Sequence, residues 1–211
     1  MLLGAYIDAS RQSLGLDIGA GTGVLSLMLA QRNPTIQITC IEIDEKSSDE
    51  CSANIKESPW SNRIQLIHHD FIEYQFTHKF DLIFTNPPYY LTDNSSNESN
   101  ERTKHITPES LLSWLNKIAN LLTIKGEFWM IWPSETSQKI IEIAHDSGLH
   151  VAKKITVYSK KNKLSRNILC FSREKKEGFN DEQFIIRNHD NSYSDAYRSL
   201  TSDFHYTEFN A

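Results

Sequence analysis

The chain has 211 residues, of which 39% are hydrophobic and 23% are charged, and its formal net charge at pH 7 is −5. A chain of this length fits one domain with a substantial core, and the composition is that of a globular protein with polar loops. No apolar stretch of about 18 residues occurs, so we expect no membrane span. The start of the chain lacks the charged and apolar regions of a signal peptide. The three cysteines are odd in number and far apart, which favours a reducing cytoplasm over a disulfide framework or a structural zinc site.

Short apolar runs alternate with helical patterns along the chain. The runs predict seven strands, at residues 14–18, 36–43, 64–68, 81–85, 126–132, 150–157 and 168–172. Helices are predicted at residues 22–31, 46–57, 111–122 and 134–147. This alternation indicates an α/β fold with a doubly wound, mostly parallel sheet. The last two strands leave no room for a crossover helix, so we expect the last strand to be antiparallel.

Two segments interrupt the alternation. Residues 92–107 are polar and aperiodic, which predicts a long mobile loop directly after the fourth strand. Residues 179–211 carry a short apolar run and several aromatic residues, among them Tyr193 and Tyr197 at helical spacing. We expect this segment to be a tail that packs on the single domain formed by residues 1–178.

The most informative motif, Asn86-Pro87-Pro88-Tyr89, follows the fourth predicted strand. Two consecutive prolines lack N–H donors, so neither a helix nor a central strand continues through them. The backbone therefore leaves the strand end extended, with carbonyl groups free to face a ligand. An amide side chain and an aromatic ring at this place suit a planar group that carries an amino group. Ligands of open α/β sheets bind at such strand ends.

A glycine-rich turn, Asp17-Ile18-Gly19-Ala20-Gly21-Thr22-Gly23, joins the first predicted strand to the first helix. Glycines let the backbone turn tightly and approach a ligand closely. The spacing differs from the dinucleotide fingerprint, because Val24 occupies the place of its last glycine. The variant favours a ligand with an amino-acid moiety, whose ammonium group Asp17 could pair with. A tight turn without any ligand is the alternative interpretation.

Acidic residues end the next two strands. Glu42 closes the second strand about 20 residues after the glycines, where an acid hydrogen-bonds ribose hydroxyls. Asp44 is better placed to cap the following helix. Asp70 follows the third strand and could accept from an adenine amino group, although alone it would be an ordinary surface aspartate. With the glycine turn and Asn86, these acids predict a nucleoside-type site along four strand ends.

Residues 151–176 are strongly basic within an acidic protein. They contain nine lysines and arginines against a single acid, Glu174. Such a cluster is either a solvated face or a surface for a phosphate backbone. The residues alone leave these two interpretations even.

The order of these motifs resembles the class I S-adenosylmethionine-dependent methyltransferases that modify amino or amide nitrogens. More closely, residues 2–6, 16–23, 54–60, 86–90 and 193–201 resemble the bacterial tRNA1(Val) (adenine(37)-N6)-methyltransferase family. The similarity covers essentially the whole chain. It implies a Rossmann-like class I methyltransferase fold, a tRNA anticodon loop as the partner, and no metal. It also implies a cytoplasmic protein, and we expect a monomer.

The resemblance implies roles for individual residues. Those that would bind S-adenosylmethionine are Asp17, Gly19, Ala20, Gly21, Gly23, Glu42, Asp70 and Asn86. Among them, Asp17 and the glycine turn would hold the methionine part, Glu42 the ribose and Asp70 the adenine ring. Asn86 and the Pro87 carbonyl would accept the two N6 hydrogens of the target base, and Tyr89 would stack on its face. The implied RNA contacts are Lys104, Lys160, Lys161, Lys163 and Arg166.

The sequence departs from the family at two places. Relatives carry residues before Leu2, including a Thr-Asp-Gly stretch that helps to close the cofactor site, so this sequence resembles a shortened member of the family. A real loss of the stretch would uncover one edge of the cofactor pocket and would weaken cofactor affinity or abolish activity. Lys104 stands where the family usually has arginine, which keeps the charge but loses the bidentate fork. Two alternative functions are kept. One is a truncated remnant that binds RNA but not cofactor, and the other is a protein glutamine-N5 methyltransferase, an enzyme that also uses Asn-Pro-Pro-Tyr. A dehydrogenase is a more distant alternative.

Overall fold

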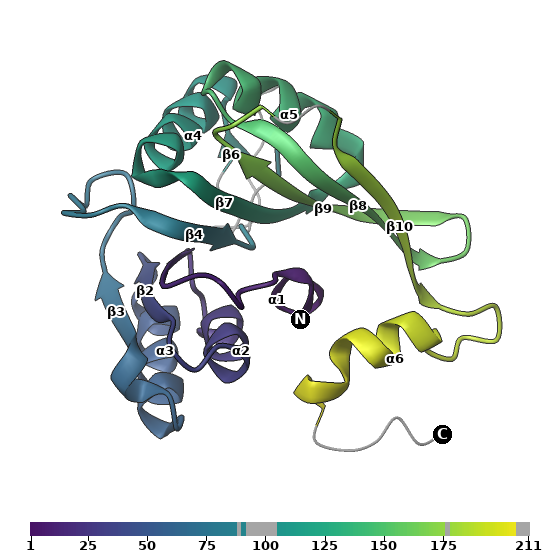
Figure 1. Cartoon of the computed structure of the whole chain (residues 1–211), viewed down its shortest axis with the longest axis horizontal. Helices are drawn as coiled ribbons and strands as arrows, with labels where there is room; N and C mark the ends of the chain where they lie inside the picture. The colour runs from purple at the N-terminus through teal and green to yellow at the C-terminus, as the bar shows by residue number, and fades with distance from the viewer. Residues whose placement is uncertain (88–89, 92–104, 176–177, 206–211) are drawn as a thin grey trace.

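The computed structural model describes residues 1–87, 90–91, 105–175 and 178–205. An eight-stranded sheet with strand order β10-β8-β9-β7-β4-β1-β2-β3 forms the centre of the molecule (Figure 1). The strands of this sheet are β1 (Leu14–Ile18), β2 (Gln37–Glu42), β3 (Ile64–His68), β4 (Phe80–Thr85), β7 (Leu122–Pro133), β8 (His150–Lys160), β9 (Lys163–Ser172) and β10 (Asn180–Arg187). The helices are α1 (Leu2–Tyr6), α2 (Val24–Arg32), α3 (Glu45–Glu57), α4 (Pro108–Leu121), α5 (Ser137–Asp146) and α6 (Asp195–Thr201). Short 3₁₀ turns lie at Ser61–Arg63, Ser134–Thr136 and Ser202–Phe204.

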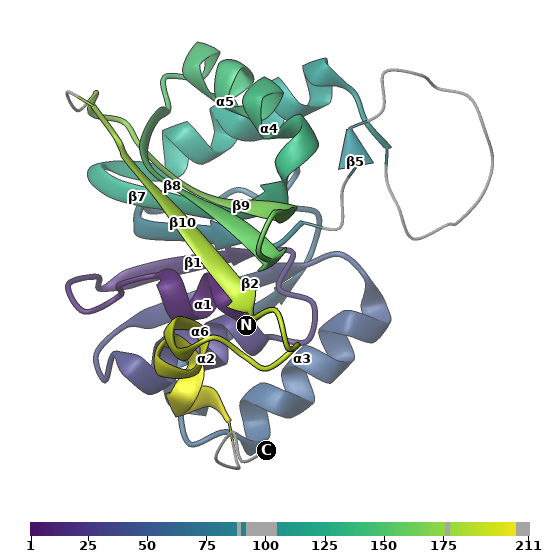
Figure 2. The same ribbon diagram turned by 90° about the vertical axis from the view of Figure 1, so that its right-hand side faces the viewer.

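The sheet separates two hydrophobic cores. Helices α4 and α5 cover one face, whereas α1, α2, α3 and α6 cover the other (Figures 1 and 2). Alternation along the strands distributes the side chains. In β4, for example, Leu82 and Phe84 pack toward α2, while Ile83 packs toward α4. The central strands are buried on both faces, which is the pattern of a parallel sheet.

The carboxyl ends of the parallel strands lie together at one edge of the sheet, and the candidate site lies at this edge. The strands β3, β2, β1, β4 and β7 are parallel to their neighbours in the order, so their carboxyl ends lie at the same edge. Strand β9 runs antiparallel to both β7 and β8. It contains residues 168–172, the last predicted strand, so the predicted antiparallel direction is confirmed. Because Arg166 pairs with Pro133 and with Val157, the β8–β9 hairpin also reaches this edge.

The sheet contains one strand more than the seven that the sequence predicted. Strand β10 pairs parallel with β8 at the sheet edge, within a segment that the pattern indicated to be a tail. Its first half, Asn180 to Gln183, is polar and gives no apolar alternation. Those polar residues are explained by their partners, since Glu182 and Asp181 pair with Lys153 and Lys154 at 3.0 and 3.4 Å. The pattern could not reveal a strand that is held partly by ion pairs.

Helix boundaries follow their capping residues. Helix α3 starts at Glu45 because the Asp44 side chain accepts from the Ser47 amide at 2.9 Å, which confirms the predicted cap. Helix α4 starts at Pro108, behind the Thr107 cap, and the proline occupies the first turn as the sequence predicted. Helix α1 was not predicted.

The segment between β4 and α4 contains a second, small sheet. Strand β5 (Tyr90–Leu91) pairs parallel with β6 (His105–Ile106). Residues 105–106 therefore form a strand, where the sequence predicted the end of a loop. Residues 92–104, the rest of that predicted loop, lie outside the described residues.

In the C-terminal segment, the rings of Tyr193 and Tyr197 stack at a centroid distance of 4.6 Å. Tyr197 lies in α6, whereas Tyr193 precedes the Ser194 cap of that helix. No helix in the described part of the chain is both long and apolar enough to cross a membrane.

Candidate active site

Backbone hydrogen bonds join the carboxyl ends of β1, β2 and β3. The amides of Gly19 and Ala20 donate to the Ile41 carbonyl at 2.9 and 3.2 Å. The His69 amide donates to the Glu42 carbonyl at 3.0 Å. The turns that follow these three strands therefore form one connected rim, on or beside which the predicted cofactor residues of the glycine turn, Glu42 and Asp70 lie.

The glycine turn leaves open space above two of its residues. Gly19, Gly21 and Gly23 have φ angles of +65°, +56° and +81°, in the left-handed region that favours glycine. A Cβ added at Gly19 or Gly21 would meet no atom within 4 Å, whereas one at Gly23 would lie 2.8 Å from Cys51 Sγ. A ligand can thus approach the backbone at Gly19 and Gly21, while Gly23 is fixed by the packing of α3.

Glu42 connects this turn to the start of α3. Its Oε2 atom accepts from the Gly21 amide at 2.8 Å. Its Oε1 atom accepts from the amides of Ile43 and Asp44 at 2.8 and 2.9 Å. A carboxylate offers about four acceptor positions, so one position on Oε2 remains for a further donor. A ribose hydroxyl is a suitable donor.

Asp17 lies buried beneath the turn with one oxygen unpaired. Its Oδ2 atom accepts from the Ser26 hydroxyl at 2.7 Å, and this hydroxyl accepts from the Cys40 thiol at 3.1 Å. Its Oδ1 atom is buried without a hydrogen-bond partner among the described residues. Burial raises the pKa of Asp17 to about 7, and the negative charge of Glu42 adds to the rise. A cationic ligand group would satisfy Oδ1 and lower this pKa.

Asp70 begins a compact turn after β3. Its Oδ1 atom accepts from the Ile72 amide at 2.6 Å, and its carbonyl accepts from the Tyr74 amide at 3.0 Å. Ile72 itself is 44% exposed, and Ile43, directly after Glu42, is 47% exposed. Sequence analysis missed these two side chains. The available signal was an isoleucine close behind each strand-end acid, where a polar turn residue is usual, and such side chains can cover the faces of a flat ring.

Asn86 lies at the end of β4, beside the glycine turn. The Thr85 hydroxyl donates to the Ile18 carbonyl at 2.7 Å, which fixes the end of β4 against the end of β1. Asn86 is exposed and Pro87 is partly exposed, so both can face a ligand. Tyr89, the predicted stacking residue, lies outside the described residues.

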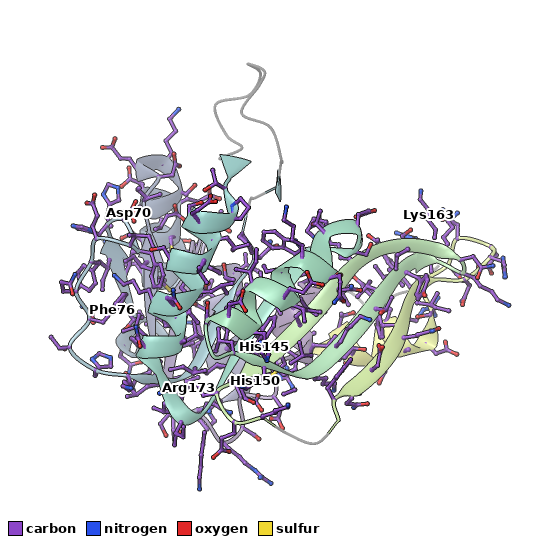
Figure 3. All side chains as sticks on the ribbon, turned by 90° about the horizontal axis from the view of Figure 1, so that it is seen from above. Asp70, Phe76, His145, His150, Lys163 and Arg173 are labelled. Carbon is purple, nitrogen blue, oxygen red and sulfur yellow. The ribbon has the colours of Figure 1, made fainter. Side chains whose placement is uncertain are left out.

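The basic segment is divided between two parts of the molecule. Four exposed cations, named here the hairpin cations, lie on or beside the turn between β8 and β9: Lys160, Lys161, Lys163 and Arg166. Figure 3 shows Lys163 at the far end of this hairpin from Arg173. Arg173, near the opposite edge of the sheet, donates to the Leu122 carbonyl at 3.4 Å. Lys153 and Lys154 pair with acids of β10, and Lys104 lies outside the described residues.

The rim fits a nucleoside that carries an amino-acid moiety. The unpaired Oδ1 of Asp17, the open space at Gly19 and Gly21, and the remaining acceptor position of Glu42 provide partners for an ammonium group, a close-lying chain and a ribose hydroxyl. In the residues that the structure describes, no group of three or more His, Cys, Asp or Glu is placed to hold a metal ion.

Comparison with known proteins identifies the group of enzymes. Residues 1–159 match the Methyltransferase small domain family. A tRNA1(Val) (adenine(37)-N6)-methyltransferase of Histophilus somni is 35% identical over 97% of this chain and 87% of its own length. Its counterpart in Proteus mirabilis is 34% identical over 97% of this chain and 84% of its own length. The chain belongs to the tRNA1(Val) (adenine(37)-N6)-methyltransferase family. It is thus an S-adenosylmethionine-dependent methyltransferase.

Solved structures show the same fold for this methyltransferase. A predicted O-methyltransferase from Agrobacterium tumefaciens superimposes with a TM-score of 0.74 at 15% identity, over 95% of this chain and 94% of the other. A putative RNA methyltransferase from Pyrococcus horikoshii gives a TM-score of 0.59 at 21% identity, over 81% of this chain and 77% of the other. The class I methyltransferase fold predicted from the sequence is confirmed.

Proposed function

We propose that this methyltransferase transfers a methyl group from S-adenosylmethionine to N6 of adenine 37 in the anticodon loop of tRNA1(Val). The observation that carries the proposal is the 35% identity over 97% of the chain to a relative with this activity in its name. The geometry of the rim supports it, because Asn86 follows β4 directly beside the glycine turn after β1.

On the cofactor side, the proposal assigns four parts of the rim. Asp17 balances the ammonium group of the methionine part, and the backbone at Gly19 and Gly21 lies against it. Glu42 accepts from the ribose, and Asp70 accepts from the adenine. When bound, S-adenosylmethionine supplies a methyl group on a sulfonium centre, which is a good leaving group.

On the acceptor side, Asn86 and Pro87 prepare the nucleophile. The lone pair of an adenine amino group is delocalised into the ring, so the nitrogen is a poor nucleophile. The Asn86 side-chain oxygen and the Pro87 carbonyl accept its two hydrogens and favour a pyramidal nitrogen aimed at the methyl carbon. Alignment of this kind can contribute roughly 7–11 kcal/mol for an ideally oriented pair.

The reaction needs no base before methyl transfer. The nitrogen forms the new N–C bond as the C–S bond breaks, and the electron pair of that bond stays on sulfur. The N6 proton becomes acidic only after the transfer, and it leaves to water. The residues of the chain therefore act by holding and orienting the two reactants.

The hairpin cations support an RNA substrate. All four are exposed, and the β8–β9 hairpin extends at the same edge of the sheet as Asn86. In the part of the chain that the structure describes, no carboxylate pairs with any of them. Exposed cations at this place can neutralise phosphates of a loop whose base enters the site unstacked. We further propose that the protein is monomeric and that it acts in the cytoplasm, in keeping with a tRNA substrate.

The test is methylation with tritium-labelled cofactor. We expect label in a tRNA1(Val) transcript with adenine at position 37 and none in a transcript with guanine there. The Asn86→Ala variant should lose at least about 100-fold in rate, by analogy with loss of one aligned polar contact in other enzymes. Asn120→Ala, an exposed residue of α4, is the matched control.

Two outcomes would contradict the proposal. Label in a release factor but not in tRNA would indicate a protein glutamine-N5 methyltransferase. An absence of heat in calorimetry with millimolar S-adenosylhomocysteine, with RNA binding retained, would indicate a remnant that has lost its cofactor.

A further inference from the structure

Lys117 of α4 contacts the segment that connects β3 to β4. Its ammonium group donates to the carbonyls of Ile72 and Tyr74, at 2.7 Å in both cases. The same group lies over the rings of Phe71 and Phe76, at 5.2 and 5.9 Å from their centroids. Figure 3 shows Phe76 and Asp70 on this segment beside α4.

The segment carries two rim residues but has little regular structure of its own. Asp70 and Ile72 lie in residues 69–79, which form turns and bends between the two strands. Internal hydrogen bonds of the Asp70 turn fix residues 70–74 relative to one another. They do not by themselves fix this turn relative to the sheet. The two carbonyl contacts of Lys117 link residues 72 and 74 to the sheet, because α4 packs on the sheet through Leu115 and Ile118.

Aromatic packing already anchors the segment to the core. Phe71 contacts Trp114 with centroids 6.1 Å apart, and Phe76 contacts Phe80 at 5.6 Å. The Lys117 ammonium adds hydrogen bonds to the carbonyls of residues 72 and 74 to this packing. Partial burial lowers the pKa of Lys117, while the charge of Asp70 acts in the opposite direction. Partial burial of the charged Lys117 ammonium costs desolvation free energy. The hydrogen bonds to the two carbonyls and the contacts with the two rings compensate this cost.

We propose that Lys117 is a positioning residue for the cofactor. It holds the turn of residues 70–74 in a fixed position relative to the sheet, and in this position Asp70 and Ile72 border the adenine end of S-adenosylmethionine. The inference rests on the proposed function, since Asp70 has a role only if the rim binds this cofactor. Lys117 acts through Asp70 and Ile72 and does not take part in methyl transfer.

The main variant is Lys117→Met, which keeps an unbranched apolar stem and removes all three donors. We expect the affinity for S-adenosylhomocysteine to fall about tenfold in calorimetry, the size expected for lost charged hydrogen bonds. The KM for S-adenosylmethionine should rise by a similar factor. With saturating cofactor, kcat on tRNA should stay within about twofold, because Asn86 and Pro87 are unaffected. Lys117→Arg should recover most of the affinity.

Two comparisons separate positioning from a general loss of structure. Lys125→Met removes an exposed lysine of β7 and should leave affinity and thermal midpoint unchanged. In an Asp70→Ala/Ile72→Ala background, Lys117→Met should cost less than about twofold in affinity, since it acts through these two residues. Full additivity of Lys117→Met with this double substitution would overturn the inference, as would an unchanged affinity of Lys117→Met. Failure of the unmodified protein to bind S-adenosylhomocysteine would instead overturn the proposed function.

Discussion

The carboxylate of Glu42 accepts a hydrogen bond from the Gly21 amide at 2.8 Å, so the end of β2 supports the turn that follows β1. Glu42 thus stabilises the glycine turn, and in the proposed function it also accepts a hydrogen bond from the ribose. The same side chain also accepts from Ile43 and Asp44 at the start of α3. Its replacement should disturb both the turn and the ligand.

Glu42→Gln provides the first prediction. The amide can keep one acceptor, but its NH₂ group would face either the Gly21 amide or the amides of Ile43 and Asp44, and donors would oppose each other. We expect a loss of about 1–3 kcal/mol in the free energy of unfolding and a loss of more than about tenfold in S-adenosylhomocysteine affinity. Urea unfolding and calorimetry measure the two effects, and an unchanged stability would show that the Gly21 contact contributes nothing.

The second prediction contrasts two glycines of the same turn. Gly23→Ala would place a Cβ 2.8 Å from Cys51 Sγ at a φ of +81°, so it should destabilise the fold by about 2–4 kcal/mol. Gly21→Ala meets no protein atom within 4 Å, so it should cost only about 1–2 kcal/mol of stability. Its methyl group would instead occupy the space proposed for the ligand. Equal ratios of affinity loss to stability loss in the two variants would argue against a ligand at Gly21.

The third prediction concerns the pH dependence that Asp17 causes. Burial raises the pKa of Asp17 to about 7 from an ordinary value of 3.8. Between these values the folded protein holds a proton that the unfolded chain has released, so the contribution of Asp17 to stability falls as the pH rises from about 4 to about 7. Asp17→Asn should remove this slope in urea unfolding across that interval.

Cofactor binding should show the opposite trend. The ionised Asp17 is the partner proposed for an ammonium group, so affinity for S-adenosylhomocysteine should increase as the pH rises through about 7. In Asp17→Asn the affinity should be lower and flat between pH 6 and about 8. An affinity of the unmodified protein that does not vary with pH would count against this role.

The fourth prediction concerns the hairpin cations. Replacing Lys160, Lys161 and Lys163 together by alanine should weaken tRNA binding and reduce the slope of log affinity against log salt by about 2 to 3. Lys154→Ala is the control, because this lysine pairs with Asp181 at 3.4 Å and is not proposed to reach RNA. Filter binding at several salt concentrations measures both. A larger effect of Lys154 than of the triple substitution would place the RNA elsewhere.

The sequence predicted the central strand ends better than it predicted the periphery of the sheet. Strand-end residues such as Glu42 and Asn86 follow long apolar runs, so their place at the sheet edge could be inferred from local pattern alone. Strand β10 could not be inferred in this way, because Asp181 and Glu182 in it pair with lysines that lie far away in the sequence. Tertiary contacts of this kind leave no periodic signal in either segment.

Side-chain detail inside the site also escaped prediction. The sequence placed Asp17 next to the glycines, but only the structure shows that one oxygen is bound to Ser26 and the other is unpaired. Likewise, the basic segment looked uniform as letters, whereas antiparallel pairing of β8 and β9 carries Lys163 and Arg173 to opposite edges of the sheet. Burial determines the hydrogen bonding of Asp17, and strand direction determines where the basic residues lie. Neither property follows from the composition of the sequence.

The position of the β8–β9 hairpin separates two properties along the chain. Every strand end of the proposed reaction centre lies before residue 88, whereas the hairpin cations lie in residues 160–166. Changes in hairpin length or sequence can therefore accumulate without altering the backbone of the glycine turn. A scaffold built in this way can acquire a new RNA target through one surface loop while its chemistry is inherited intact.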